Sequence, residues 1–231
     1  MKITWLGHAS FRIETESTVM LLDPWLDGNP AFPDARRAEA IAGATHILVT
    51  HGHGDHAGEA AGLSKETGAP VVGIYDWVSW ITETEGVDGI GFNKGGTVAL
   101  GDAMVTMVNA VHSSSTPGAD NAPVYVGAEA GYMIAAGDVV LYAMGDTDVM
   151  ADMALFGELH RPSHALVPIG GIFTMDSPRA AWACKKFFDF KAVIPCHYAT
   201  FPLLEQTADV FARAVAPVPV IAPEIMESVE I

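Results

Sequence analysis

Short apolar segments separated by turn residues recur along the chain, and their periodicity predicts alternating strands and helices. Three such segments open the chain and favour a meander of short strands. They are residues 2–5, 10–14 and 18–22. A helical pattern at 35–41 then leads into the apolar segment 47–49, which predicts a short buried strand.

From residue 58 onward, helical and strand patterns alternate. Helices are expected at 58–66, 76–84, 148–159, 177–188 and 203–215. Strands are expected at 70–74, 97–100, 104–110, 124–126, 132–135, 139–143, 165–168 and 193–195. Ser177 followed by Pro178 predicts a helix start, with the serine as N-cap and the proline at the first helical position. Because both halves begin with strands and end in strand–helix alternation, we expect an α/β chain with two mixed β-sheets covered by helices on their outer faces. A single domain over residues 1–231 is expected.

Composition narrows the class of protein. Apolar residues make up 50% of the chain and charged residues 17%, which is typical of a compact enzyme with a large core. The formal charge of −16, from 12 basic and 28 acidic residues, disfavours nucleic acid and anionic membranes as partners, so a small-molecule substrate is expected. Cys184 and Cys196 fall in apolar patterns where each packs as a small hydrophobe. With no signal pattern or membrane-length apolar run, a cytoplasmic location is expected.

The densest polar chemistry is Thr-His-Gly-His-Gly-Asp-His at residues 50–56, directly after the strand at 47–49. It supplies four ligand-type side chains, His51, His53, Asp55 and His56. Gly52 and Gly54 are expected to let the backbone turn sharply. In an extended segment, side chains two apart share a face, so His51 and His53 would bind one ion while the next two ligands turn toward a second. A cluster this dense indicates a metal site rather than a polar surface loop.

Single polar residues at other predicted strand ends extend this site. His112, Asp146 and His197 each end a predicted strand, and three such residues at corresponding positions favour further metal ligands over isolated structural residues. His8 and Asp23 also follow strands near the N-terminus, where turn roles compete with functional ones.

The series His51-x-His53-x-Asp55-His56, His112, Asp146 and His197 resembles the metallo-β-lactamase superfamily over the whole chain. Four further segments are similar to one branch, the metal-dependent hydrolases related to L-ascorbate-6-phosphate lactonases. They are Trp-Leu-Gly-His-Ala-Ser-Phe at 5–11, Leu-Leu-Asp-Pro-Trp at 21–25, Pro-Ile-Gly-Gly at 168–171 and Ile-Pro-Cys-His-Tyr-Ala-Thr-Phe-Pro at 194–202. Such motifs are specific for fold and metals, and much less so for substrate.

The resemblance implies a four-layer αβ/βα sandwich with two divalent metal ions per chain. His51, His53 and His112 would hold the first ion, Asp55, His56 and His197 the second, and Asp146 would bridge them. Zn²⁺ suits this donor set best, and Mn²⁺ or Fe²⁺ also fits it. His8 and Asp23 would lie beside the ligands or contact substrate. Departures from the pattern are His46 and His164, where acidic residues are expected, and Ile172, where a polar residue is common.

Two ions about 3.5–4 Å apart can share a water whose pKa falls toward about 7. The leading hypothesis is therefore a dinuclear hydrolase whose metal-bound hydroxide cleaves a small ester, lactone or phosphodiester. Asp55 and Asp146 would orient the nucleophile, and His8 or Tyr198 would donate a hydrogen bond to the transition state. Two alternatives stay open: an iron-dependent oxygenase or redox enzyme of the same fold, and a metal-stabilised binding protein without turnover.

Two apolar features complete the sequence-based expectations. Five residues in predicted loops favour a partly apolar substrate; they are Trp25, Phe32, Phe173, Met175 and Phe201. The proline-rich segment 216–223 is read as an edge strand or a contact surface, so a homo-oligomer is kept among the partners.

Overall fold

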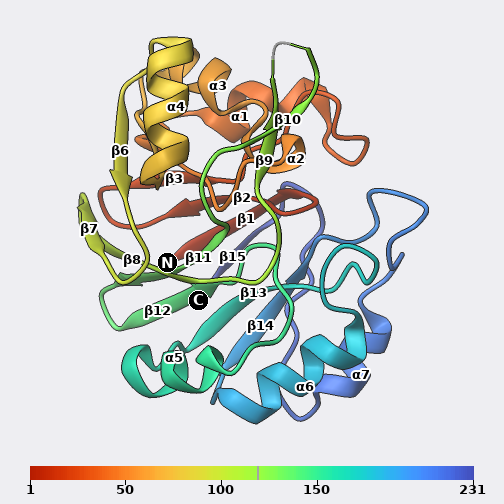
Figure 1. Cartoon of the computed structure of the whole chain (residues 1–231). Coiled ribbons are helices and arrows are strands. Elements are labelled where there is room, and N and C mark those ends of the chain that lie inside the picture. Colours follow the sequence, from red (N-terminus) through yellow and green to blue (C-terminus); the bar gives the residue numbers. More distant parts are fainter. Residues whose placement is uncertain (119) are drawn as a thin grey trace.

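The computed structural model describes residues 1–118 and 120–231 and contains two β-sheets stacked between two layers of helices (Figure 1). The first sheet has the strand order β15-β1-β2-β3-β4-β5-β6. Its strands are β1 (Lys2–Gly7), β2 (Ser10–Glu14), β3 (Val19–Leu22), β4 (His46–Leu48), β5 (Val71–Ile74), β6 (Gly89–Phe92) and β15 (Ser228–Glu230). Pairing is antiparallel from β15 to β3 and parallel from β3 to β6, so this sheet is mixed.

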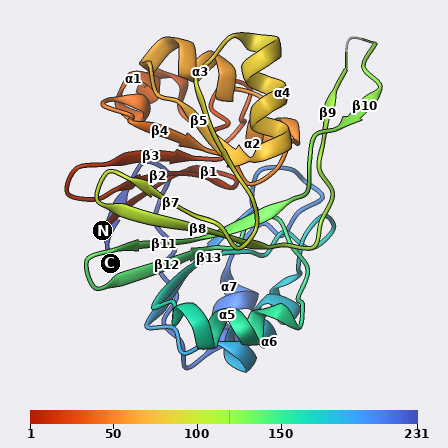
Figure 2. The same ribbon diagram turned by 60° about the vertical axis from the view of Figure 1, so that its left-hand side comes forward.

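The second sheet has the order β14-β13-β12-β11-β8-β7. Its strands are β7 (Thr97–Leu100), β8 (Ala103–Asn109), β11 (Ala130–Ala136), β12 (Val139–Ala143), β13 (His164–Pro168) and β14 (Ala192–Cys196). The strands from β12 to β14 are parallel and the others antiparallel, which confirms the expected pair of mixed sheets. A separate two-stranded ribbon, β9 (Ser115–Pro117) with β10 (Pro123–Tyr125), projects from the body in Figure 2.

Helices cover the outer face of each sheet (Figure 1). Over the first sheet lie α1 (Arg37–Ile41), preceded by a 3₁₀ turn at Asp34–Arg36, α2 (Gly54–Ala57), α3 (Ala60–Thr67) and α4 (Tyr75–Glu85). Over the second lie α5 (Asp152–His160), α6 (Ser177–Phe187) and α7 (Asp209–Val215). In the part of the chain that the structure describes, no helix has the length and apolar character needed to cross a membrane.

Side-chain hydrogen bonds tie the two sheets together. The hydroxyl of Tyr132 on β11 donates to the carbonyl of Val49, which directly follows β4, over 2.5 Å. At the opposite end of the strands, the Asp102 carboxylate in the β7–β8 turn accepts hydrogen bonds from the turn between β2 and β3. The donors are the backbone NH groups of Glu16 and Ser17 and the hydroxyls of Thr15, Ser17 and Thr18. The sheets are therefore fixed relative to each other at both ends.

Several predicted boundaries were wrong. Helix α6 is capped by Asp176, whose carboxylate accepts from the backbone NH of Arg179, rather than by Ser177. Helices α5 and α7 begin at Asp152 and Asp209, later than the patterns at 148 and 203 indicated. Strands β6, β9 and β15 were missed, in the case of β6 because glycines weaken the strand pattern. Gly89 is needed on β6 since a Cβ there would lie 2.5 Å from Cγ1 of Val78 on α4.

Candidate metal centre

The metal ligands predicted from the sequence, together with His8 and Asp23, lie at one edge of the stacked sheets, where strands end. His8 follows β1, Asp23 follows β3, His51 follows β4, Asp146 follows β12 and His197 follows β14. The carboxyl ends of these strands meet at the same edge, so residues far apart in the sequence converge there.

A first group of imidazoles comprises His51, His53 and His112, with one ring nitrogen of each within 4.8 Å of the others. His51 Nε2 lies 3.0 Å from His53 Nδ1. The far nitrogens are held by hydroxyls, since His51 Nδ1 lies 3.0 Å from Thr50 Oγ1 and His53 Nε2 lies 3.3 Å from Ser113 Oγ. The near nitrogens are thereby left to face a common point.

A second group comprises His8, Asp55, His56 and His197, again within 4.8 Å of one another. The ring of His56 is oriented by Asp23, because its Nδ1 lies 2.9 Å from Oδ2 of that carboxylate. Asp23 is itself fixed at 2.7 Å by both the backbone NH and the hydroxyl of Thr50. Thr50 thus contacts His51 of the first group and Asp23, which orients His56 of the second.

The backbone of the segment 50–56 is not extended throughout, as the sequence predicted, because a helix begins within it. His53 is the N-cap residue of α2, which begins at Gly54, so Asp55 and His56 are consecutive helical residues about 100° apart around the axis. This geometry, rather than alternation in a strand, turns them away from the first group. The expected role of the glycines is also corrected: neither has a positive φ, and Gly52 is required because a Cβ would lie 2.5 Å from Cγ2 of Val126.

Asp146 lies between the two groups. Its Oδ2 is 3.6 Å from Nε2 of His112 in the first group, and 3.4 Å and 3.1 Å from Nε2 of His56 and His197 in the second. One carboxylate oxygen therefore faces imidazoles of both groups. Its side chain is 3% exposed, so bulk water does not solvate this charge.

The chemistry of this donor set fits divalent metal ions. Imidazole nitrogens and carboxylate oxygens converge without a thiolate, as in zinc, manganese and non-haem iron sites. Among the described residues, His56 Nε2 and Asp146 Oδ1 are buried and have no hydrogen-bond partner, although both belong to the cluster. Buried polar atoms normally have partners, and a bound cation would supply them.

Electrostatic coupling in the cluster is strong. Burial disfavours the charged form of His56, but the carboxylates of Asp146, Asp23 and Asp55 together raise its pKa well above the ordinary value of 6.5. Burial likewise opposes ionisation of Asp146, yet His56 and His197 hold the pKa of this carboxyl well below its usual range. Burial lowers the pKa of His51 far below 6.5, which keeps that imidazole neutral and able to bind a cation.

Backbone strain concentrates at the same edge. His8, Asp23 and His197 have φ values of 52°, 44° and 57°, in the left-handed region that residues other than glycine rarely adopt. The His8 carbonyl accepts from Trp5 Nε1 and from the backbone NH of His197, each over 3.0 Å. These bonds hold two strained residues against each other, as is common at functional sites.

His8 and Tyr198 were predicted as hydrogen-bond donors rather than metal ligands, and the structure places them differently. His8 is fully buried, with Nε2 3.1 Å from Asp55 Oδ2 and Nδ1 3.0 Å from Thr200 Oγ1. Tyr198 is 8% exposed and its ring stacks on Trp5 at 5.2 Å, which places it in the packing behind His197. Burial raises the pKa of Tyr198 to about 12, so its hydroxyl stays protonated at neutral pH.

Sequence reasoning missed the hydroxyl residues that orient the imidazoles. They are Thr50, Ser113 and Thr200. A signal was present for the first two, since Thr50 directly precedes His51 and Ser113 directly follows His112. Nothing in the sequence pairs Thr200 with His8, from which it is separated by 192 positions.

Comparison with known proteins agrees with this geometry. The family model described as beta-lactamase superfamily domain matches residues 2–197, so the chain belongs to the metallo-β-lactamase superfamily. Within it, the chain is 61% identical over 231 residues, all of both chains, to a UPF0173 metal-dependent hydrolase of Cereibacter sphaeroides. It is also 58% identical over 229 residues, 99% of each chain, to one of Paracoccus denitrificans. The expectation of a metal-dependent hydrolase is thereby confirmed.

Solved structures show the same fold. Igni18, a novel metallo hydrolase from Ignicoccus hospitalis, superposes with a TM-score of 0.86 at 31% identity over 99% of this chain and 97% of that one. CmlA, a diiron β-hydroxylase from Streptomyces venezuelae, gives a TM-score of 0.77 at 14% identity over 100% of this chain and 54% of its own. At that identity the likeness concerns the fold alone. The four-layer arrangement expected from the sequence is confirmed.

Proposed function

We propose that the cluster binds two divalent metal ions and that the protein hydrolyses a small ester, lactone or phosphodiester. His51, His53 and His112 would hold one ion, and Asp55, His56 and His197 the other. The observation that carries this proposal is the position of Asp146 Oδ2, within 3.1–3.6 Å of imidazoles from both groups, as a bridging ligand requires. Zn²⁺ is the first candidate, with Mn²⁺ and Fe²⁺ next.

Bound ions would supply a hydroxide nucleophile near neutral pH and polarise the scissile carbonyl or phosphoryl oxygen. Residues of the chain itself would orient the nucleophile. Asp55 and Asp146 are the carboxylates placed to accept a hydrogen bond from the nucleophile, and His8 holds Asp55 through its Nε2. Of the two residues predicted to donate to the transition state, His8 directs its N–H to Asp55 and so positions that carboxylate, while Tyr198 packs on Trp5.

Elemental analysis with an activity screen tests the proposal. Protein purified without chelators or affinity metals is expected to contain close to two Zn or Mn per chain, and to hydrolyse a lactone, an aryl ester or a phosphodiester in a chelator-sensitive way. A metal content near two with no turnover on any of these classes would overturn the hydrolase assignment. About one iron per chain together with oxygen uptake would favour the redox alternative instead.

A further inference from the structure

A cavity of about 470 Å³ opens beside the second ligand group. Its walls are the segment 170–172, which follows β13, and the segment 203–207, which follows the turn after β14. This volume falls within the range of small-molecule pockets, about 300–1,000 Å³.

The wall of the cavity packs against the metal centre at Gly170. A Cβ at this position would overlap the carbonyl oxygen of His197 and lie 2.7 Å from its Nδ1. The cavity wall is thus separated from a proposed metal ligand by one glycine backbone. A ligand group in the cavity would therefore be separated from His197 by the backbone of Gly170.

The walls are preformed by hydrogen bonds. The backbone NH of Glu205 donates to the carbonyl of Gly170 over 3.2 Å, and the NH of Ala199 donates to the carbonyl of Glu205 over 2.8 Å. The side-chain amide of Gln206 donates to the carbonyls of Phe201 and Leu204. These bonds fix the two segments to each other and to the His197 loop.

The mouth of the cavity carries two large apolar side chains, Ile172 and Leu203, beside the polar Gln206 and Thr207. Ile172 and Leu203 line the cavity and are 61% and 70% exposed, and the neighbouring Phe173 is 53% exposed. Phe201, two positions before Leu203 in the chain, stacks on Trp25 at 5.7 Å, and each of these rings meets the His8 ring edge-on. Large apolar side chains gathered at a catalytic edge indicate a contact surface for an apolar ligand group.

The charge of the cavity lining disfavours anionic ligands. Among the described residues that line the cavity, Glu205 is the one ionisable side chain, and no lysine or arginine faces it. A phosphate or carboxylate placed there would meet a like charge without a cation to offset it. Phe32 and Met175, which the sequence assigned to the same apolar surface, are instead buried at 6% and 1% exposure and belong to the core.

We infer that this cavity is the substrate subsite that takes an uncharged apolar acyl or alkyl group of a neutral ester or lactone. The inference rests on the proposed hydrolase function and specifies its substrate class. Ile172 and Leu203 contact the apolar chain, and Glu205 excludes substrates with an anionic terminus.

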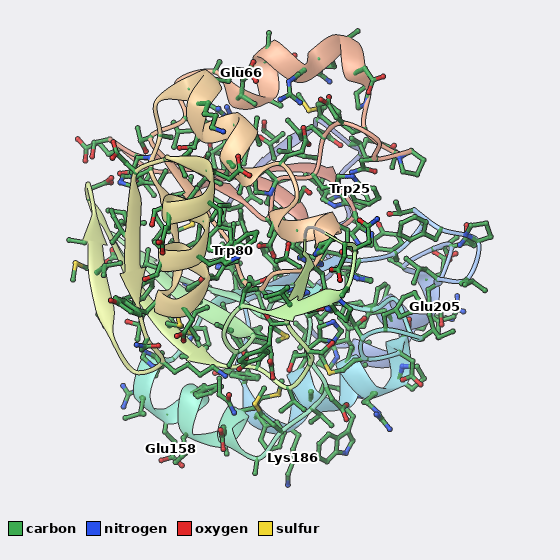
Figure 3. The ribbon with its side chains drawn as sticks, turned by 45° about the horizontal axis from the view of Figure 1, so that its top comes forward. Trp25, Glu66, Trp80, Glu158, Lys186 and Glu205 are labelled. Atoms are coloured by element: carbon green, nitrogen blue, oxygen red, sulfur yellow. The ribbon has the colours of Figure 1, made fainter. Side chains whose placement is uncertain are left out.

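Chain-length selectivity tests the subsite in the metal-loaded protein. We compare p-nitrophenyl acetate, p-nitrophenyl octanoate and the p-nitrophenyl monoester of suberic acid, which carries a terminal carboxylate. Leu203→Gln is the test variant, and Leu159→Gln is its matched control, since Leu159 is an equally exposed leucine at 75%. It lies on α5, whose Glu158 appears far from Glu205 in Figure 3.

The wild type and Leu159→Gln are expected to prefer octanoate over acetate in kcat/KM, and Leu203→Gln to lose about tenfold of that preference. Glu205→Gln should raise the rate for the suberate monoester relative to octanoate. Equal selectivity in both leucine variants would overturn the inference. So would a Leu203→Gln variant that dissociates an oligomer on size exclusion while keeping wild-type selectivity, because Leu203 would then belong to a subunit interface.

Binding of octanamide, measured by calorimetry, separates the subsite from the hydrolase proposal. If no ester is turned over but octanamide binds the wild type and at least fivefold more weakly to Leu203→Gln, the subsite stands and the hydrolase proposal fails. If ester turnover occurs and octanamide binds both leucine variants equally, the hydrolase proposal stands and the subsite fails.

Discussion

Nε2 of His8, which directly follows β1, lies 3.1 Å from Oδ2 of Asp55 on α2. Burial lowers the pKa of His8 to about 4, so the ring is neutral at pH 7 and carries one N–H. Asp55 cannot donate, because its pKa is held well below the usual range by His56 and His8 against the effect of burial. The N–H of His8 therefore points at Asp55, which leaves Nδ1 as an acceptor 3.0 Å from the Thr200 hydroxyl. The carbonyl of Tyr198, 3.1 Å from the same hydroxyl, competes for its hydrogen.

His8→Ala should lower kcat/KM by about 10–100-fold, because Asp55 loses the donor that orients it. His8→Gln, whose amide nitrogen reaches the position of Nε2, should retain part of the activity. Steady-state kinetics and metal content of both variants check this. Full activity in His8→Ala would remove His8 from the site.

The same geometry predicts the tautomer of His8. In metal-free protein at pH 7, ¹⁵N NMR should show the proton on Nε2, and Thr200→Val should shift the equilibrium toward the Nδ1 form, because Nδ1 loses its donor. An unchanged spectrum in Thr200→Val would show that Thr200 does not orient the ring.

Removal of Asp146 or His112 should abolish turnover and reduce metal content while the fold is retained. Asp146→Asn loses the bridging charge, and an activity loss of at least about 100-fold is expected. His112→Ala should lose the ion of the first group. The matched control is His160→Ala on α5, outside the cluster, which should keep wild-type metal content and kinetics.

Asp23 supports the second group without joining it. Asp23→Ala should lower metal affinity by about 10–100-fold, since His56 loses the carboxylate that fixes its ring. Competition titration with a chromophoric chelator measures this. Asp34→Ala, an exposed aspartate in the 3₁₀ turn before α1, serves as the control and should bind metal normally.

Metal binding should release a proton from His56. The raised pKa of His56 means that its charge stabilises metal-free protein fully below pH 6.5, and that this contribution is lost as the pH rises through the folded-state pKa. Metal affinity should therefore increase with pH across the same range. Calorimetry in buffers of different ionisation enthalpy counts the proton; no release at pH 7 would mean that His56 is already neutral.

Much of this site could be predicted from the chain because its ligands follow apolar segments directly. His51, Asp146 and His197 sit at strand ends where no packing reason calls for them, and the structure brings them together. The turn of α2 was not predicted, since four residues of helix leave no periodicity in a histidine-rich segment. Thr200 and the subsite depend on tertiary contacts between remote loops, which local patterns do not encode.

The hydrogen bonds of Asp102 should stabilise the contact between the two sheets, and this stabilisation should be lost in acid. Hydrogen bonds from Thr15, Ser17 and Thr18 hold the pKa of Asp102 well below its ordinary value of 3.8. Its stabilising effect is thus complete above that value and is lost as the pH falls through the folded-state pKa. Asp102→Ala should lower the Tm at pH 7, whereas Asp138→Ala in the β11–β12 turn should not; equal Tm values would show that this turn adds no stability.

Both termini lie side by side (Figure 2), where Met1 and Ile231 exchange backbone hydrogen bonds next to the pair β1–β15. They flank the start of β1, whereas His8 follows its far end, about 20 Å away for a strand of this length. A tag, a fluorophore or a surface linkage at either terminus would therefore lie away from the candidate metal centre. The protein is suited to immobilised assays, in which metal can be stripped and restored on the same molecules.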